Sequence, residues 1–302
     1  MKCDKCYNAA IIHQKYSGMH LCKRHFEKDV ERKVKGTIRK YKLIERGDII
    51  AFALSGGKDS TVVLHIIHSL FKDLPGIQLI AISVDEGIYG YTEKTLETAK
   101  QVCKKLNIRH EIVSFEDQFG LTLDQMAILG ERAPCTYCGV FRRVILNRTA
   151  KALGATKLAT GHCLDDEAQT VLMNLLRGDM ERLIRLMPAK KPGLVPRIKP
   201  LRNVPEKEVA LYALLKELPV LFDACPYAHL SLRAEIRDML NVFEVKHPST
   251  KYSLMKSFDI LIKSLKKEME EVGLQRCEIC GEPTMGNMCQ ACKLLKIIES
   301  RR

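Results

Sequence analysis

Short apolar runs alternate along the middle of the chain with longer stretches in which apolar residues recur every three or four positions. Such short runs are typical of buried parallel strands, and the periodic stretches are typical of helices packed on them. The pattern predicts strands at residues 48–54, 78–84, 109–114 and 156–160, and helices at 60–71, 92–106, 138–153, 164–177, 205–217 and 231–242. Regular alternation indicates an α/β fold, a doubly wound parallel sheet that binds its ligand at the carboxyl ends of the strands.

The chain around this block divides into smaller segments. A helical pattern at 26–45 precedes the first strand, and a Lys- and Glu-rich amphipathic helix is predicted at 253–271. Five prolines between Met187 and Pro205 predict an extended connection over the active face. We expect five segments: an amino-terminal zinc finger at 1–25, a linking helix at 26–47, a catalytic domain at 48–245, a helical linker at 246–274 and a zinc ribbon at 275–302.

The first strand and helix of the predicted catalytic domain meet in Ser-Gly-Gly-Lys-Asp-Ser, residues 55–60. The two glycines let the backbone approach a ligand closely, and the N–H groups of a helix N-terminus favour an anion. Lys58 adds a positive charge and the two serines add hydroxyl donors. Because Asp59 follows Lys58, the motif differs from the Walker phosphate loop. The sequence predicts a phosphate site; the alternative is a turn that only connects strand to helix.

Cysteines concentrate at both ends of the chain. The carboxyl-terminal set repeats the Cys-x2-Cys spacing that can surround one tetrahedral zinc, and the amino-terminal set has the same design with one histidine. The predicted ligands are Cys3, Cys6, Cys22 and His25, and Cys277, Cys280, Cys289 and Cys292, with His20 as an alternative to His25. Each site has four protein ligands, so we expect structural zinc, because a catalytic zinc keeps an open position.

Gly161-His-Cys-Leu-Asp-Asp166 forms a second junction between a strand and a helix. Asp165 and Asp166 can cap the helix, and beside an ATP site one of them could hold Mg²⁺ against the phosphates. Of the two carboxylates, we favour Asp166.

Three further cysteines lie at separated positions in the middle block: Cys135 and Cys138 in Pro-Cys-Thr-Tyr-Cys-Gly, and Cys225 in Asp-Ala-Cys-Pro-Tyr. Three thiolates do not complete a zinc tetrahedron, but they suit a 4Fe–4S cluster with one iron left open. Spacing alone leaves three interpretations: an open cluster, a redox pair with a third thiol, or a third zinc with another ligand.

Charge and composition narrow the class of partner. The formal net charge is +13, with 49 Lys and Arg against 36 Asp and Glu, which is typical of proteins with a polyanionic partner such as RNA but equally of a charge that serves general solubility. No stretch approaches 18 uncharged apolar residues and no signal peptide is evident, so we expect a soluble, cytoplasmic protein. Twelve cysteines in such a protein indicate metal sites and reactive thiols.

These motifs occur together, in this order, across nearly the full chain. The combination resembles the tRNA 2-thiouridine synthetases, PP-loop ATP pyrophosphatases with an adenine nucleotide α-hydrolase-like fold. The resemblance implies an enzyme that adenylates carbon 2 of a tRNA uridine with ATP and replaces the oxygen by sulfur, at position 54 of the T-loop in preference to wobble position 34. It also implies Mg²⁺, two structural zinc ions, a 4Fe–4S cluster, a ubiquitin-like sulfur donor and a homodimer.

The resemblance assigns roles to individual residues. Cys135, Cys138 and Cys225 would hold the cluster, and Asp59 and Asp166 would act with Mg²⁺ in catalysis. Arg142 occupies a position where relatives carry a basic residue that touches the nucleotide, and an arginine offers a fork in place of a point charge. The implied ATP-binding residues are Ala53, Ser55, Gly56, Gly57, Lys58, Asp59, Ser60, Val84, Arg142, Gly161 and Asp166.

Three other interpretations stay open. The first is a tRNA thiolase that uses a persulfide without a cluster. A PP-loop synthetase that amidates a small molecule would leave both zinc modules, the third Cys-x2-Cys and the positive charge without a function. A non-catalytic zinc-ribbon RNA-binding protein would be expected to have lost Lys58 or Asp59, and both are present.

Overall fold

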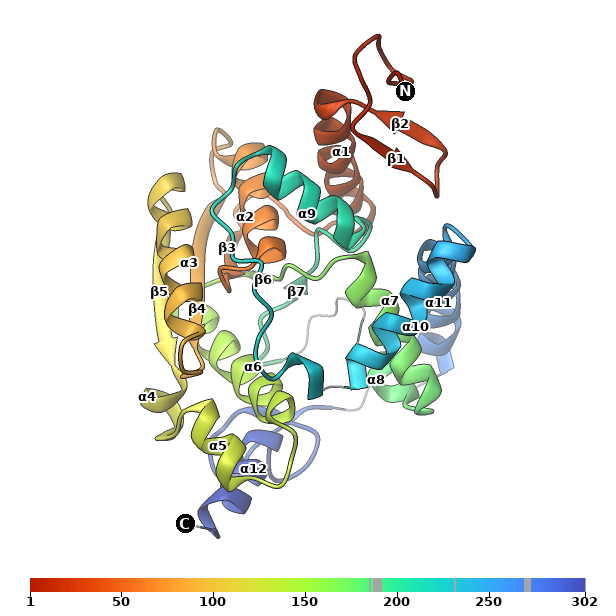
Figure 1. Ribbon diagram of the computed structural model, residues 1–302. Helices are drawn as coiled ribbons and strands as arrows, with labels where there is room; N and C mark the ends of the chain where they lie inside the picture. The colour runs from red at the N-terminus through yellow and green to blue at the C-terminus, as the bar shows by residue number, and fades with distance from the viewer. Residues whose placement is uncertain (185, 187–191, 231, 269–272, 302) are drawn as a thin grey trace.

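The computed structural model describes residues 1–184, 186, 192–230, 232–268 and 273–301, and its centre is a five-stranded parallel sheet (Figure 1). The spatial order is β5-β4-β3-β6-β7. The strands are β3 (Ile49–Ala53), β4 (Gln78–Asp85), β5 (Arg109–Ser114), β6 (Lys157–Ala159) and β7 (Arg197–Ile198). The chain reverses direction across the sheet between β3 and β6, and ligands of such sheets bind at that point.

Helices cover both faces of the sheet, because successive strand residues point to opposite sides. Ile50 and Phe52 of β3 pack into one core cluster, and Ala51 between them packs into the other. The helices of the first face are α1 (Lys23–Tyr41), α2 (Lys58–Phe71), α3 (Thr92–Leu106) and α9 (Glu206–Leu215). Those of the second face are α4 (Phe115–Phe119), α5 (Leu123–Leu129), α6 (Pro134–Ala152) and α12 (Gln290–Glu299). The predicted α/β fold is confirmed.

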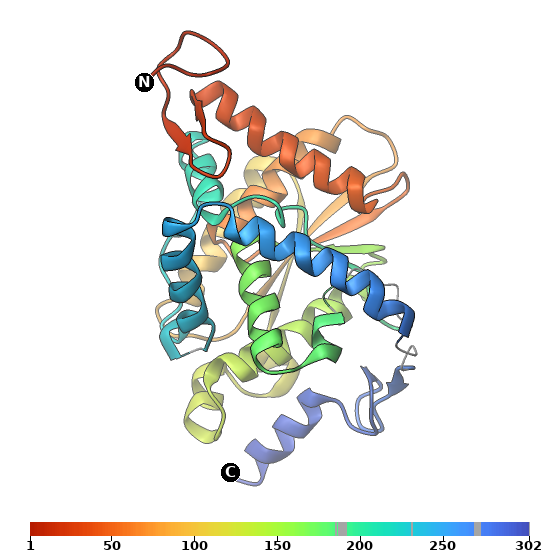
Figure 2. The ribbon, with the colours of Figure 1, turned by 90° about the vertical axis from the view of Figure 1, so that its right-hand side faces the viewer.

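A third core cluster lies beyond the β7 edge of the sheet. Its helices are α7 (Leu164–Leu176), α8 (Met180–Ile184), α10 (Leu232–Lys246) and α11 (Thr250–Glu268). Figure 2 shows α11 running across α7. No helix in the described part of the chain is long and apolar enough to cross a membrane.

The two terminal modules lie at opposite ends of the molecule (Figure 2). The amino-terminal module is the antiparallel hairpin β1 (Ile12–Gln14) and β2 (Met19–Leu21), whose Leu21 joins the first core cluster. The carboxyl-terminal module is β8 (Gln275–Arg276), β9 (Pro283–Thr284) and α12, which packs on α6. Both modules are therefore fixed to the central domain by buried apolar contacts.

Several boundaries differ from those predicted. The helix predicted from residue 138 begins at Pro134, because proline is favoured at the first helical position, and both cysteines of the motif therefore lie on helix α6. The helix predicted at 26–45 ends at Tyr41, where Lys42 adopts a left-handed conformation with φ 48°. The helix predicted at 253–271 begins at Thr250, and residues 269–271 lie outside the described residues, as do 187–191 of the proline-rich connection.

Candidate active site and metal centres

The PP-loop, residues 55–60, joins the end of β3 to the first turn of α2 and is closed by its own serines. Ser60 Oγ accepts a hydrogen bond from the Ser55 amide at 3.1 Å and donates one to the Gly57 carbonyl at 3.0 Å. The first amides of α2 have no acceptor within the helix, so they are available to an anion. The loop has the local geometry of a phosphate cradle.

Two glycines allow close approaches around this loop. Gly56 has φ +74°, and a Cβ there would lie 2.1 Å from the Thr95 carbonyl oxygen of α3. A Cβ at Gly161 would lie 2.6 Å from the Ser60 amide nitrogen. The two predicted strand-to-helix junctions are therefore in direct backbone contact, which no larger residue would permit.

Lys58 lies among carboxylates. Its Nζ is 3.0 Å from Asp59 Oδ2 and 2.8 Å from Glu206 Oε1 at the start of α9. Burial raises the pKa of Asp59 to about 6; Lys58 opposes this shift, while the charges of Asp166 and Glu206 add to it. Asp59 Oδ1 is buried and has no hydrogen-bond partner among the described residues. This oxygen is the group at the site that could accept a hydrogen bond or bind a cation.

The structure separates the roles of the two aspartates after Cys163. Asp165 is buried, forms an ion pair with Lys251 and accepts a hydrogen bond from the Glu206 amide at 2.7 Å. Asp166 Oδ2 accepts from the Cys163 amide at 3.1 Å, and its charge raises the pKa of Asp59. Asp165 thus ties α7 to α9 and α11, whereas Asp166 faces the PP-loop.

Arg142 of α6 lies one helical turn beyond Cys138 and contacts the segment that follows β4. Its Nη1 is 3.5 Å from Glu86 Oε1, and Glu86 follows the end of β4, close to Val84. Burial raises the pKa of Glu86, and Arg142 opposes that shift. Ala53 occupies the matching carboxyl end of the neighbouring strand β3.

The three core cysteines share one neighbourhood but do not form a tight ligand group. Cys135 and Cys138 lie in the first turns of α6, and Cys135 Sγ donates to the Tyr227 carbonyl, two residues beyond Cys225, at 3.4 Å. Burial, with smaller contributions from the charges of Cys225 and Cys135, raises the pKa of Cys138 to about 11, and the charge of Arg142 opposes this shift. Within the described ranges these three are not among the ligand groups whose atoms all lie within 4.8 Å of one another.

Both terminal cysteine sets are assembled as such groups, with all ligand atoms within 4.8 Å. The members are Cys3, Cys6, Cys22 and His25, and Cys277, Cys280, Cys289 and Cys292. His25 Nδ1 is 3.4 Å from the sulfurs of both Cys3 and Cys22. His20 lies outside the group, stacks on His13 with ring centroids 4.2 Å apart, and is 3.7 Å from Asp4.

Comparison with known proteins identifies the family. A sequence model of the PP-loop domain matches residues 26–243, and a model of the N-terminal LIM domain of the 2-thiouridine synthetase TtuA matches residues 2–27. The chain is 42% identical over 320 residues to the tRNA 2-thiolation protein NcsA of Haloferax volcanii, covering 99% of this chain and 100% of the relative. This chain belongs to the tRNA 2-thiolation family.

Two further relatives of this tRNA 2-thiolation family are named for different uridines. The tRNA-5-methyluridine(54) 2-sulfurtransferase of Pyrococcus horikoshii is 36% identical over 295 residues, with 97% of this chain and 93% of the relative covered. The solved structure of the U34-tRNA thiolase NcsA from Methanococcus maripaludis, with its 4Fe–4S cluster, has a TM-score of 0.87 at 39% identity. That match covers 98% of this chain and 96% of the other.

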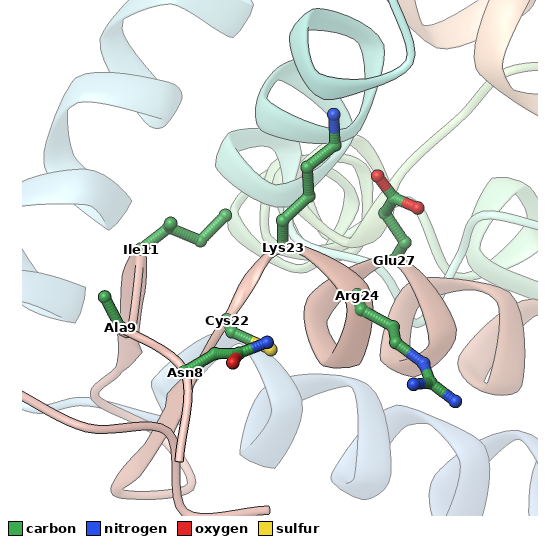
Figure 3. A pocket seen from close by; sticks show the side chains of 7 residues that line it. All are labelled: Asn8, Ala9, Ile11, Cys22, Lys23, Arg24 and Glu27. Carbon is green, nitrogen blue, oxygen red and sulfur yellow. The ribbon is translucent and has the colours of Figure 1, made fainter. Parts of the chain in front are cut away.

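Two hollows lie away from the family's PP-loop. One of about 340 Å³ opens beside the amino-terminal module, where Asn8, Cys22, Lys23 and Arg24 line it (Figure 3). Another of about 530 Å³ lies between α6 and the carboxyl-terminal ribbon and is lined by Arg148, Lys151 and Arg276. Neither of these two hollows is lined by a PP-loop residue or a core cysteine.

Sequence reasoning missed Glu206, Lys251 and Glu86. Glu206 contacts Lys58, and Lys251 holds Asp165, although each partner is distant in the chain. The one local signal is the pair Pro205 and Glu206, which predicts the start of a helix. It does not indicate which lysine the Glu206 carboxylate contacts.

Proposed function

We propose that this chain is an ATP-dependent tRNA-uridine 2-sulfurtransferase that adenylates carbon 2 of a uridine and exchanges its oxygen for sulfur. Oxygen at that position is a poor leaving group, and its adenylation lets it depart with AMP. The observation that carries the proposal is the contact of the PP-loop with the loop before Asp166, on the sheet edge that also receives Cys138 and Cys225. Relatives named for tRNA 2-thiolation along the whole chain support it.

The PP-loop residues act on the phosphates. The amides of Ser55 to Ser60 and the ammonium group of Lys58 stabilise the charge that develops as pyrophosphate leaves. Asp59 and Asp166 would hold Mg²⁺, which would supply positive charge to the phosphates. The backbones of Ala53, Val84 and Gly161 line the nucleotide, and Arg142 reaches toward it from α6.

Cys135, Cys138 and Cys225 would hold a 4Fe–4S cluster, the group that the solved Methanococcus maripaludis relative contains. Their chemistry fits, since three thiols occupy one neighbourhood and leave one iron without a protein ligand. When bound, the cluster supplies an iron site for sulfide. Arg142 lies beside these thiols, where its charge lowers the pKa of Cys138 and Cys225 and favours their thiolate forms.

The two terminal groups hold one structural zinc each. Both offer four soft or imidazole ligands in a closed set, which suits tetrahedral zinc. We further propose a cytoplasmic homodimer that receives sulfur from a ubiquitin-like carrier protein.

The test is reconstitution of thiolation. Anaerobically purified protein with iron and sulfide should convert tRNA to 2-thiouridine only when ATP is present, and should release AMP and pyrophosphate. Nucleoside mass spectrometry of mapped tRNA fragments distinguishes position 54 from position 34. Amidation of a small molecule without tRNA would contradict the proposal. If iron-free protein were fully active, the cluster mechanism would be wrong and a persulfide relay would take its place in the proposal.

A further inference from the structure

Strand β7 forms one edge of the sheet (Figure 1), and its Arg197 contacts Arg143 of helix α6. An Nη of Arg197, on β7, donates to the backbone carbonyl oxygen of Arg143, on α6, at 3.4 Å. The guanidinium group of Arg143 folds back along α6, so a methyl carbon at Gly139 would lie 3.6 Å from its Nη1. Gly139 directly follows Cys138, and Arg143 therefore lies one helical turn from the cysteine site.

Neither guanidinium group has a carboxylate partner among the described residues, whereas their basic neighbours do. Arg142 is paired with Glu86, and Arg182 with Asp179. Partial removal from water lowers the pKa of Arg143, and the charges of Arg142 and Arg182 lower it further. Removal from water, followed by the charge of Arg143, lowers the pKa of Arg197 to about 10. The Arg143 side chain is exposed, so an anion from solution can reach it, and an anion bound by both arginines would relieve the repulsion between their charges.

The sequence around Arg197 offers no local counter-ion. Between Arg182 and Glu206 the chain contains no Asp or Glu but six basic residues, namely Arg185, Lys190, Lys191, Arg197, Lys199 and Arg202. Within the described part of this segment, Lys199 and Arg202 form ion pairs with Glu167 and Asp259, whereas Arg197 has no carboxylate partner.

The pair also lies beside the reactive centre. Arg142, the residue before Arg143, is 3.5 Å from Glu86 Oε1, and its charge lowers the pKa of Cys138. An anion held by Arg143 and Arg197 would therefore lie next to the residue that connects the end of β4 with the cysteines.

We propose that Arg143 and Arg197 form a binding site for a backbone phosphate of the RNA strand that carries the target uridine. The inference rests on the proposed tRNA function and adds a positioning site to it. Two guanidinium forks match the geometry of phosphate oxygens, and such contacts fix the register of a nucleic acid without reading its bases. Pyrophosphate released from ATP offers the same chemistry, and the experiment distinguishes the two sources.

The test compares two double variants of the full chain. Arg143→Gln/Arg197→Gln should weaken tRNA binding on the order of tenfold to a hundredfold and lower the slope of log affinity against log salt by about 1 to 2. ATP and pyrophosphate affinities should be unchanged. The thermal midpoint should not fall, because the substitution removes two charges that lack a counter-ion.

The control for net charge is Arg46→Gln/Arg109→Gln; Arg109, unlike Arg143 and Arg197, pairs with a carboxylate, Glu111, at 2.6 Å, and this ion pair is exposed. Both of these arginines lie at the amino-terminal ends of strands, Arg46 before β3 and Arg109 at the start of β5, on the edge opposite the PP-loop. The control should retain wild-type tRNA affinity within about twofold at every salt concentration, since it removes no phosphate contact.

Three results would overturn the inference. Equal loss of tRNA affinity in the control would indicate a general charge effect. A loss of affinity confined to ATP or pyrophosphate would mean that the two arginines bind the nucleotide. A lower thermal midpoint with unchanged tRNA affinity would mean that the two arginines have a structural role. Wild-type protein that binds tRNA through this pair but forms no 2-thiouridine would refute the proposed function and leave the phosphate site standing.

Discussion

The terminal and the core cysteines use the same side chain in opposite ways. At both ends of the chain four ligand atoms lie within 4.8 Å of one another before any metal is considered. In the core, the three thiols share a neighbourhood, and burial raises the pKa of Cys138 and Cys225. An assembled group can bind metal with little reorganisation and favours stability, whereas a looser set with an incomplete ligand number favours chemistry. We therefore expect substitutions in the core to remove activity and those at the ends to remove stability.

The largest effect is expected at the core. Cys138→Ser should reduce thiolation to background, because a cluster needs all three thiolates, while zinc content and the thermal midpoint change little. All three quantities can be measured on one preparation: zinc content by metal analysis, the thermal midpoint from melting curves, and thiolation by nucleoside mass spectrometry. Cys163→Ser is the matched control, a buried thiol beside the PP-loop that belongs to neither kind of site, and it should retain iron. Loss of zinc from Cys138→Ser would erase the distinction between the two regions.

Substitution of Lys58 tests whether activity can be lost when every metal ligand is kept. Lys58→Ala should lower the thiolation rate by on the order of a hundredfold to a thousandfold, because a charge that stabilises the departing phosphates is gone. Glu206→Gln removes the partner of Lys58 at 2.8 Å and should leave the rate within about fivefold, since phosphate replaces that partner during the reaction. A Lys58→Ala enzyme with the full rate would remove the PP-loop from the mechanism.

Features formed by residues close together in the sequence could be predicted better than contacts between residues far apart in the chain. The cysteine spacings and the PP-loop are contiguous, so their chemistry could be predicted before any fold was known. Asp165 and Asp166 are adjacent and chemically equal, and only Lys251, on a helix far along the chain, separates their roles. Strand β7 is two residues long and follows prolines, so periodicity gave no sign of it. Contacts made by packing, such as that of Lys58 with Glu206, leave no pattern in a single sequence.

At the ends of the chain, stability should respond more than chemistry. Cys277→Ser should lose about one zinc per chain and lower the free energy of unfolding by on the order of several kcal/mol, because metal binding contributes directly to folding. Thiolation per folded molecule should fall far less than in Cys138→Ser. Cys103→Ser, a buried thiol outside every cysteine set, should keep both zinc ions and cost about 1 kcal/mol or less. Unchanged zinc in Cys277→Ser would contradict the assignment of that group.

The smallest effect concerns the polar contacts that fix the amino-terminal module independently of its metal. Asp29 is buried, and burial alone would raise its pKa, but hydrogen bonds from Gln14, Arg32 and Lys33 lower it to about 2. Since the folded-state pKa lies below the unfolded value, this stabilisation is present above about pH 4 and is lost as the pH falls through 2. A shift of this size corresponds to about 2 kcal/mol.

Asp29→Asn should therefore unfold more easily than the wild type by about 2 kcal/mol at pH 6, and the difference should shrink as the pH is lowered below about 4. Denaturant unfolding at several pH values measures this difference in the free energy of unfolding. Any loss of zinc at low pH affects both proteins equally, because they carry the same zinc ligands, and so does not contribute to the difference. Asp238→Asn, at an exposed carboxylate with side-chain exposure of 68%, should change stability by less than about 0.5 kcal/mol. A difference independent of pH would mean that Asp29 acts through its shape alone, and the module would then depend on zinc and apolar packing for its attachment.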